Sequence, residues 1–148
     1  MSAPSSSGAT PLIESAIEFA GLRLSEDARD NDRAVNEEAP LEVWLEVIEG
    51  YPDLRRWVAG NKTVPIPVLE RLAEDADPIV RWTVASKRSA PSHVLDGLAH
   101  DGDESVRVRV ARNRAVSVGT LRALAHDESW VVRGVGQEAL SARGLSSD

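Results

Sequence analysis

Residues 75–127 read DADPIVRWTVASKRSAPSHVLDGLAHDGDESVRVRVARNRAVSVGTLRALAHD, and they contain the same 26-residue pattern twice in succession. The pattern begins one copy earlier and starts again after residue 127, so that arginine recurs at Arg55, Arg81, Arg107 and Arg133. Leucines, alanines and aspartates keep the same interval. A period of roughly 20–50 residues is typical of chains that fold as stacked units, each burying its apolar face against the next. The sequence therefore predicts a repeat protein.

Each copy is expected to contain two helices joined by a turn. In the first helix, Val80, Val84 and Ala85 share one face, and a proline suits the first turn. In the second helix, Leu95 and Leu98 lie on a short i, i+3 stripe. We therefore expect an all-α fold, an α-solenoid of about four helix-pair repeats with an N-terminal capping helix.

Asparagine stands at the end of the first helix in two copies, as Asn61 and Asn113, with Lys87 at the same position between them. Asparagine tolerates the left-handed backbone conformation in which many helices end. We expect these two residues to terminate their helices.

The pattern fades toward both ends of the chain, which divides it into segments. Ile13, Ile17, Ala20 and Leu24 form one apolar stripe that predicts the capping helix, whereas residues 25–39 suit either a short helix or an irregular connector. Trp44 is expected in the core. The expected organisation is a disordered tail at 1–10, an acidic N-terminal cap with a degenerate first repeat at 11–50, repeats at 51–141 and a frayed tail at 142–148.

Composition excludes several kinds of site. The 148 residues include no cysteine, which excludes disulfides, iron–sulfur clusters and thiolate zinc sites. His100 and His126 share a repeat position and lie a whole repeat apart, too far to share a metal ion. The first residues lack the features of a secretory signal, and no apolar run reaches the roughly 20 residues that span a bilayer. We expect a cytoplasmic protein with no membrane segment, metal or cofactor.

The net charge of −7 is unevenly distributed. Residues 1–50 carry 11 acidic and 3 basic residues, whereas residues 51–148 carry 13 acidic and 14 basic residues. The acidic portion has two interpretations. It keeps the protein soluble, or it shields a basic surface until a partner displaces it.

The periodic arginines are interpreted as part of the scaffold. Aspartate precedes each by six residues in three copies, and stacking would bring like charges to roughly 8–10 Å from one another. Interleaved aspartates would remove that repulsion and join one helix pair to the next. A row of phosphate-binding arginines is the alternative interpretation. The predicted structural ladder consists of Asp75, Arg81, Asp101, Arg107, Asp127 and Arg133.

Arginines and tryptophans outside the period are the candidate binding residues, because stacking does not require them. Arginine is well suited to acidic partners and tryptophan to the centre of interfaces. Trp82 occupies a position that also accepts polar residues, so we expect it to be half exposed, and a surface of Trp82, Arg109 and Arg112 is the leading hypothesis. With Lys87 completing a basic patch, the candidates are Trp57, Trp82, Arg88, Arg109, Arg112, Arg114 and Trp130.

The quoted run resembles the variant leucine-rich repeat, a bacterial repeat similar in style to HEAT repeats. The residues that carry the resemblance are Asp77, Pro78, Val80 and Arg81 at the start, Ala111, Arg112 and Asn113 in the middle, and Leu121, Leu124 and Ala125 at the end. The resemblance covers residues 51–133 and, weakly, 30–50. It implies a right-handed superhelix of paired helices, one of each pair short or 3₁₀-like. Some relatives hold an iron–sulfur centre on cysteines, which this chain lacks.

No activity comes with such a fold. The sequence favours a non-catalytic protein-interaction module, an adaptor, inhibitor or immunity-type binder that presents a rigid surface to a protein partner. One alternative is nucleic-acid binding through the basic patch. Another is an enzyme of lyase or glycosylase type on a HEAT-like scaffold, although no arrangement typical of a catalytic site occurs in the sequence.

Overall fold

The computed structural model describes residues 12–148, and all of their regular elements are helical. An isolated parallel β-bridge between Leu12 and Glu38 is the one strand-like contact in this part of the chain. The all-α class predicted from the sequence is confirmed for these residues. The expected tail at 1–10 lies outside them. The chain divides into two compact units, of which the first ends at Pro65 and the second runs from Ile66 to Asp148.

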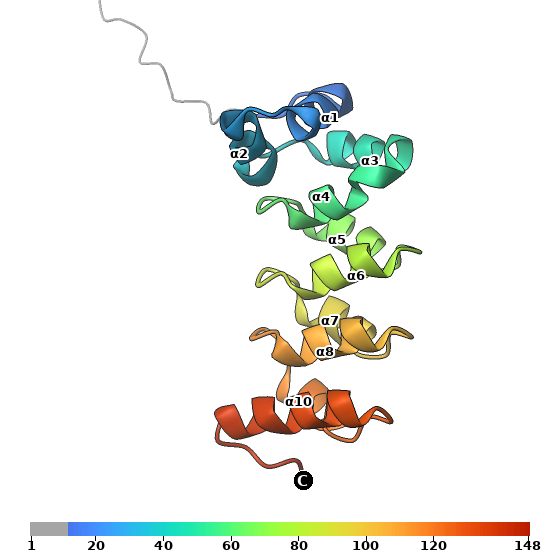
Figure 1. Ribbon diagram of the computed structural model, residues 1–148, viewed down its shortest axis with the longest axis vertical. Helices are drawn as coiled ribbons and strands as arrows, with labels where there is room; N and C mark the ends of the chain where they lie inside the picture. The colour runs from blue at the N-terminus through green and yellow to red at the C-terminus, as the bar shows by residue number, and fades with distance from the viewer. Residues whose placement is uncertain (1–11) are drawn as a thin grey trace, which may run out of the picture. The chain divides into compact units, whose positions relative to one another are not determined.

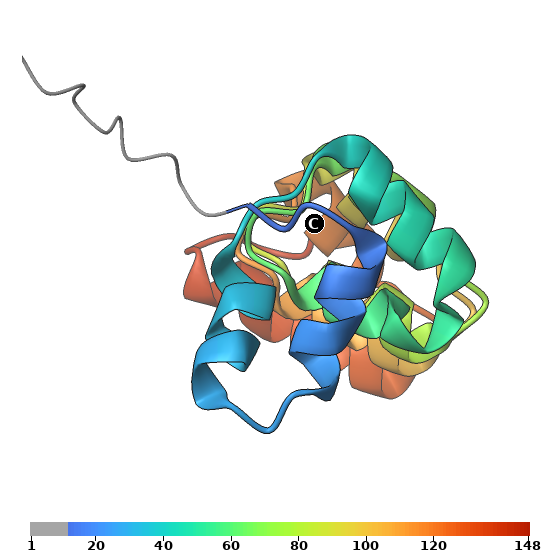
Figure 2. The same cartoon turned by 90° about the horizontal axis from the view of Figure 1, so that it is seen from above.

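The N-terminal unit consists of four α-helices and one 3₁₀ turn. These are α1 (Ala16–Leu24), α2 (Ala28–Asn36), α3 (Leu41–Gly50), η1 (Pro52–Leu54) and α4 (Arg55–Gly60). Helix α1 packs against both α2 and α3, and Figure 2 shows α1 and α2 side by side. The segment for which the sequence left two interpretations, residues 25–39, therefore contains a short helix, with non-helical residues on both sides of it.

The apolar stripe predicted for the first helix is partly wrong. Ile17 is 74% exposed and Leu24 is 81% exposed, whereas Phe19 is fully buried. The ring of Phe19 packs edge-on against Trp44 of α3, with 5.2 Å between ring centroids. Because Phe19 is the largest apolar side chain of α1, its burial decides which face of the helix turns inward, and Ile17 then faces solvent. Trp44 lies in the core, as expected.

The C-terminal unit repeats one helix pair along the chain. Its helices are α5 (Ile66–Leu72), α6 (Pro78–Ala85), α7 (Ser92–Leu98), α8 (Glu104–Arg112), α9 (Val118–Leu124) and α10 (Trp130–Ala142). Helix α6 contacts α8, and α8 contacts α10, while α7 and α9 each contact the helices before and after them. Figure 1 shows α6, α8 and α10 in successive layers. The 26-residue period thus corresponds to one layer of this unit.

Each layer begins with the same helix cap. Asp77, Asp103 and Ser129 precede α6, α8 and α10, and their side-chain oxygens accept hydrogen bonds from the backbone N–H two residues further on. Such a cap satisfies a donor that the first turn of a helix leaves unpaired. Because this cap recurs every 26 residues, the first helix of each of these layers starts at the same position of the repeat.

Asn61 and Asn113 end α4 and α8, as predicted, but they do so without the left-handed conformation that asparagine tolerates. Their φ angles are −62° and −76°, and among residues 12–148 only a glycine has positive φ. The Asn113 amide instead reaches the preceding layer, where its Nδ2 donates to the carbonyls of Ala85 at 2.8 Å and Lys87 at 2.9 Å. Its Oδ1 accepts from the N–H of Ala115 at 2.8 Å. We call this arrangement the asparagine bridge.

The N-terminal unit contains a second asparagine bridge. Nδ2 of Asn61 donates to the carbonyls of Ala34 at 2.9 Å and Glu37 at 3.1 Å, and its Oδ1 accepts from the N–H of Thr63 at 2.7 Å. Asn61 is fully buried and Asn113 is 6% exposed. A buried amide that bonds three backbone groups joins a helix end to the chain segment beside it, which explains why this position tolerates a polar residue in the core.

The last layer differs from the others because α10 lies unusually close to α9. A Cβ built on Gly136 would be 2.8 Å from the backbone nitrogen of Ala125 and 3.0 Å from the carbonyl carbon of Leu124. The equivalent position is Val110 one layer earlier. Glycine is therefore required at Gly136 by close backbone contact between the two helices.

This contact predicts opposite effects for two glycines of the same helix. We expect Gly136→Ala to lower the free energy of unfolding by about 2 kcal/mol, because the new methyl group meets backbone that cannot move aside cheaply. Gly134→Ala should raise it by roughly 0.5–1 kcal/mol through helix propensity, since nothing lies within 4 Å of its Cβ. Urea denaturation of the two variants measures both effects, and equal behaviour would contradict the close packing.

Candidate functional site

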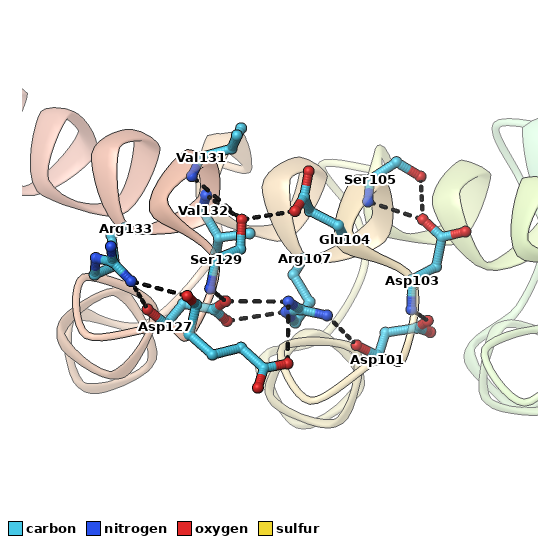
Figure 3. A network of polar contacts seen from close by, with 11 residues as sticks. Asp101, Asp103, Glu104, Ser105, Arg107, Asp127, Ser129, Val131, Val132 and Arg133 are labelled. Atoms are coloured by element: carbon cyan, nitrogen blue, oxygen red, sulfur yellow. Dashed lines mark hydrogen bonds and ion pairs between the residues drawn. The ribbon is translucent and has the colours of Figure 1, made fainter.

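The predicted arginine ladder forms a continuous polar network within the C-terminal unit. Arg107 makes a two-pronged ion pair with the next layer's Asp127, with Nε at 2.9 Å and the second nitrogen at 3.0 Å from the two carboxylate oxygens. Its remaining nitrogen donates to the carbonyl of Asp101 at 2.7 Å (Figure 3). One guanidinium therefore bonds both the segment before α8 and the segment before α10, which belong to successive layers.

The same geometry recurs one layer earlier. Arg81 pairs with Asp101 at 2.7 and 3.0 Å and donates to the carbonyl of Asp75 at 2.7 Å. Arg133 in the last layer donates to the carbonyls of Asp127 and Glu128. The sequence predicted that aspartate and arginine alternate, and Arg81 and Arg107 each pair in space with the aspartate 20 residues further on.

Burial and charge in the ladder point to a structural role. Hydrogen bonding to Asp127 raises the pKa of Arg107 despite its burial. Burial acts to raise the pKa of Asp127, but hydrogen bonds from Arg107 and from the Ser129 N–H outweigh it, and the pKa lies below its usual value. Binding of a phosphate by Arg81 or Arg107 would require breaking these hydrogen bonds.

The structure brings together Trp82 and Arg109 on the exposed face of the C-terminal unit. The Arg109 guanidinium carbon lies 5.0 Å from the centroid of the Trp82 ring, and its Nε donates to the Ser86 hydroxyl at 2.8 Å. Trp82 is 41% exposed. Arg109 belongs to α8 and the other two residues to α6, so a cation–π contact joins the faces of two layers. We call this pair, with the exposed Ile79, the Trp82 face.

A small hollow adjoins the Trp82 face. It has a volume of about 260 Å³ and is lined by Pro78, Ile79, Trp82, Asp103 and Ser105. Ile79 is 55% exposed. The hollow thus combines apolar side chains of α6 with the polar Asp103 and Ser105 at the start of α8, and its size suits one side chain of a partner.

Arg112 and Arg114 lie in a different feature, an open groove of about 630 Å³ between α8 and α10. Arg143 and Glu138 from α10 and its end also line it, over a floor of small apolar side chains. Arg143 itself donates to the carbonyl of Val116 at 2.9 Å, which ties down the start of the segment expected to fray. The groove therefore carries three guanidinium groups and one carboxylate.

The remaining candidates are not gathered at either feature. Arg88 is exposed in the loop after α6 and does not line the groove. Lys87 is partly buried, which lowers the pKa of its ammonium group. Trp130 is 77% exposed at the start of α10. Trp57 belongs to the N-terminal unit, where Arg23 and Arg56 pack on its ring.

Three arginines escaped the sequence analysis. Arg143 follows the last clear copy of the repeat. Arg23 lies in a segment where the repeat is weak, and Arg56 adjoins the periodic Arg55. No spacing in the sequence relates Arg23 to Trp57, because they meet through the packing of separate helices. No local signal in the sequence singles out Arg23, since acidic residues follow it at Glu26 and Asp27.

Residues 12–148 contain no group of three or more His, Asp and Glu side chains placed to hold a metal ion. Within the same residues, none of the helices has both the length and the apolar character needed to cross a bilayer. Comparison with known proteins found no matching family model, no matching curated protein and no matching solved structure.

Proposed function

We propose that this chain is a non-catalytic protein-interaction module, and that its C-terminal unit binds a protein partner through the Trp82 face. The proposal rests on one observation above all, the half-exposed Trp82 with Arg109 stacked over it. Stacking of the repeats does not require either residue. Val108 stands at the position of Trp82 one copy later, and Thr83 at the position of Arg109 one copy earlier. Tryptophan and arginine are the residues most often found at energetic centres of interfaces.

The layered helices support a rigid mode of binding. The arginine ladder and the asparagine bridge hold successive layers of the C-terminal unit together, so a partner meets a preformed surface. Preformed surfaces lose little conformational entropy on binding. On this basis we propose a right-handed α-solenoid of the variant leucine-rich repeat type with about four repeats. We propose that it works in the cytoplasm as an adaptor, inhibitor or immunity-type binder.

The basic groove supports an acidic partner and also defines the competing function. Arg112, Arg114 and Arg143 would attract a partner's carboxylates or a phosphate backbone equally well. The chain's net charge of −7 opposes a polyanion at long range. A protein with acidic residues beside an apolar anchor satisfies both the groove and the Trp82 face, and a nucleic acid does not need the apolar anchor.

Replacing the anchor tests this function directly. We expect Trp82→Ala to weaken capture of the partner from native lysate by about 30-fold or more, which corresponds to about 2 kcal/mol. Its free energy of unfolding should fall by less than about 1 kcal/mol, because the side chain is half exposed. Capture is quantified by mass spectrometry, with and without nuclease, at equal amounts of immobilised protein.

Leu24→Ala is the matched control, since Leu24 is an exposed apolar residue of the N-terminal unit. It should leave capture unchanged. Unchanged capture of the partner by the Trp82→Ala variant would contradict the proposal that the Trp82 face binds it. Loss of capture after nuclease treatment, together with a steep dependence of the affinity on salt concentration, would favour nucleic acid as the ligand instead.

A further inference from the structure

The N-terminal unit contains a tryptophan on which two arginines pack. The guanidinium carbon of Arg23, at the end of α1, lies 3.8 Å from the centroid of the Trp57 ring. That of Arg56, the neighbour of Trp57 in α4, lies 4.7 Å from the same centroid. Trp57 is 39% exposed, so this cluster opens to solvent. We call it the Trp57 cluster.

Neither guanidinium of the cluster is neutralised. Within residues 12–148, Arg23 donates to the neutral amide oxygen of Asn31 at 2.9 Å, and no carboxylate forms an ion pair with Arg23 or Arg56. Nε of Arg23 is buried and has no hydrogen-bond acceptor. Burial lowers the pKa of Arg23, and the positive charge of Arg56 lowers it further.

The lack of a carboxylate is notable because this half of the chain is rich in them. Residues 1–50 carry 11 acidic residues. Arg33 in the same unit pairs with Glu18 and Glu37, each at 2.8 Å, and Arg29 pairs with Asp27 at 3.0 Å. Arg29 and Arg33 of this unit are thus neutralised by carboxylates, whereas no ion pair forms at the two arginines of the Trp57 cluster among the residues that the structure describes.

The two cations are close enough to act on one anion. Their guanidinium carbons are at most 8.5 Å apart, the sum of their distances from the ring centroid. This upper limit is about the Debye length at physiological salt, roughly 8 Å, so salt screens the repulsion between the two charges only in part. An oxyanion beside the ring would offset their repulsion and accept hydrogen bonds from the exposed Arg56 guanidinium.

We propose that the Trp57 cluster binds a carboxylate on an acidic segment of a protein, with an apolar neighbour of that carboxylate packed on the indole ring. Guanidinium groups bind carboxylates through strong charge-assisted hydrogen bonds, and an exposed indole adds apolar contact area. A nucleic acid fits less well, because the net charge of −8 on residues 1–50 repels an extended polyanion more than a segment with one or two carboxylates. The site belongs to the N-terminal unit and does not depend on the Trp82 face.

A short peptide tests the site without knowledge of the natural partner. The probe is a capped Leu-Glu-Glu-Leu peptide, titrated into the full chain while the arginine Nε–Hε signals are followed by NMR. We expect saturable shifts of the Arg23 and Arg56 signals, and no shift with the matched Leu-Gln-Gln-Leu peptide. Trp82→Ala should leave these shifts unchanged, which separates this site from the function proposed for the C-terminal unit.

Two exposed arginines provide the variant and its control. Arg56→Gln should weaken peptide binding about tenfold by removing charge-assisted hydrogen bonds, whereas Arg29→Gln should not change it. Both side chains are exposed, so neither substitution threatens the fold. The proposal is overturned if no saturation occurs, if the two variants bind equally, if the glutamine peptide shifts the same signals, or if a single-stranded oligonucleotide of equal charge binds more tightly than the glutamate peptide.

Discussion

Asp127→Ala should lower the free energy of unfolding by about 3 kcal/mol, the largest effect that we expect from a single substitution. The substitution leaves the Arg107 side chain, which is 10% exposed, without its two-pronged partner. It also removes the acceptor for the Ser129 N–H. Urea denaturation followed by circular dichroism measures the loss.

Glu128→Ala is the matched control for this prediction. Glu128 lies 3.9 Å from the same guanidinium, but its side chain is 91% exposed. An exposed pair of this kind contributes about 0.5 kcal/mol or less. If both substitutions destabilise the protein equally, the buried pair does not join the layers in the way described.

The ladder also predicts how stability depends on pH. The pKa values of Asp101 and Asp127 lie below their usual values in the folded protein, because hydrogen bonds to arginine outweigh the effect of burial. Their contribution is complete above the unfolded pKa of about 4 and is lost as pH falls through the folded value. The Asp127→Ala variant should therefore lose less stability than the unmodified chain as the pH falls below about 4, as measured by urea denaturation at a series of pH values.

Asn113→Ala is the second substitution with a large expected effect, a loss of about 2–3 kcal/mol. It leaves the Ala85 and Lys87 carbonyls without the amide that bridges them, and the Ala115 N–H without its acceptor. Asn113→Asp should cost at least as much at neutral pH, because it brings a negative charge against two carbonyl oxygens.

The control for Asn113 is its exposed neighbour. Arg112→Ala should change the free energy of unfolding by less than about 0.5 kcal/mol, since Arg112 makes no buried contact that the repeat requires. Amide hydrogen exchange gives an independent readout, because the Ala115 N–H should lose protection in Asn113→Ala. Unchanged protection would mean that the asparagine bridge contributes little.

Periodicity predicted those features that each layer must repeat. The helix pairs, the buried Leu95 and Leu121, and the alternation of aspartate with arginine follow from a 26-residue interval because every layer presents the same surface to the next. Trp82 was expected to be half exposed because its position also accepts arginine and valine, and it is 41% exposed. These inferences need no knowledge of long-range contacts.

Other features depend on packing that no local pattern records. The buried face of α1 is set by Phe19 meeting Trp44, and a stripe count alone chose Ile17 and Leu24 instead. Asparagine at a helix end is often explained by its tolerance of the left-handed backbone conformation. Here its side chain instead donates hydrogen bonds to carbonyl groups of a neighbouring chain segment. The Trp57 cluster likewise forms between two helices of unrelated spacing, and the closeness of α9 to α10 at Gly136 is visible only in three dimensions.

The most direct test of the proposed function is photo-crosslinking in cells of the chain's native source. A photoreactive benzoyl-phenylalanine replaces Ile79, which is 55% exposed and lines the hollow beside Trp82. The same group at the exposed His100 serves as the control position. We expect a discrete protein adduct at position 79 that is absent at position 100 and lost when Trp82→Ala is added. No adduct at position 79, equal adducts at both positions, or an adduct removed by nuclease would contradict the assignment of the Trp82 face to a protein partner.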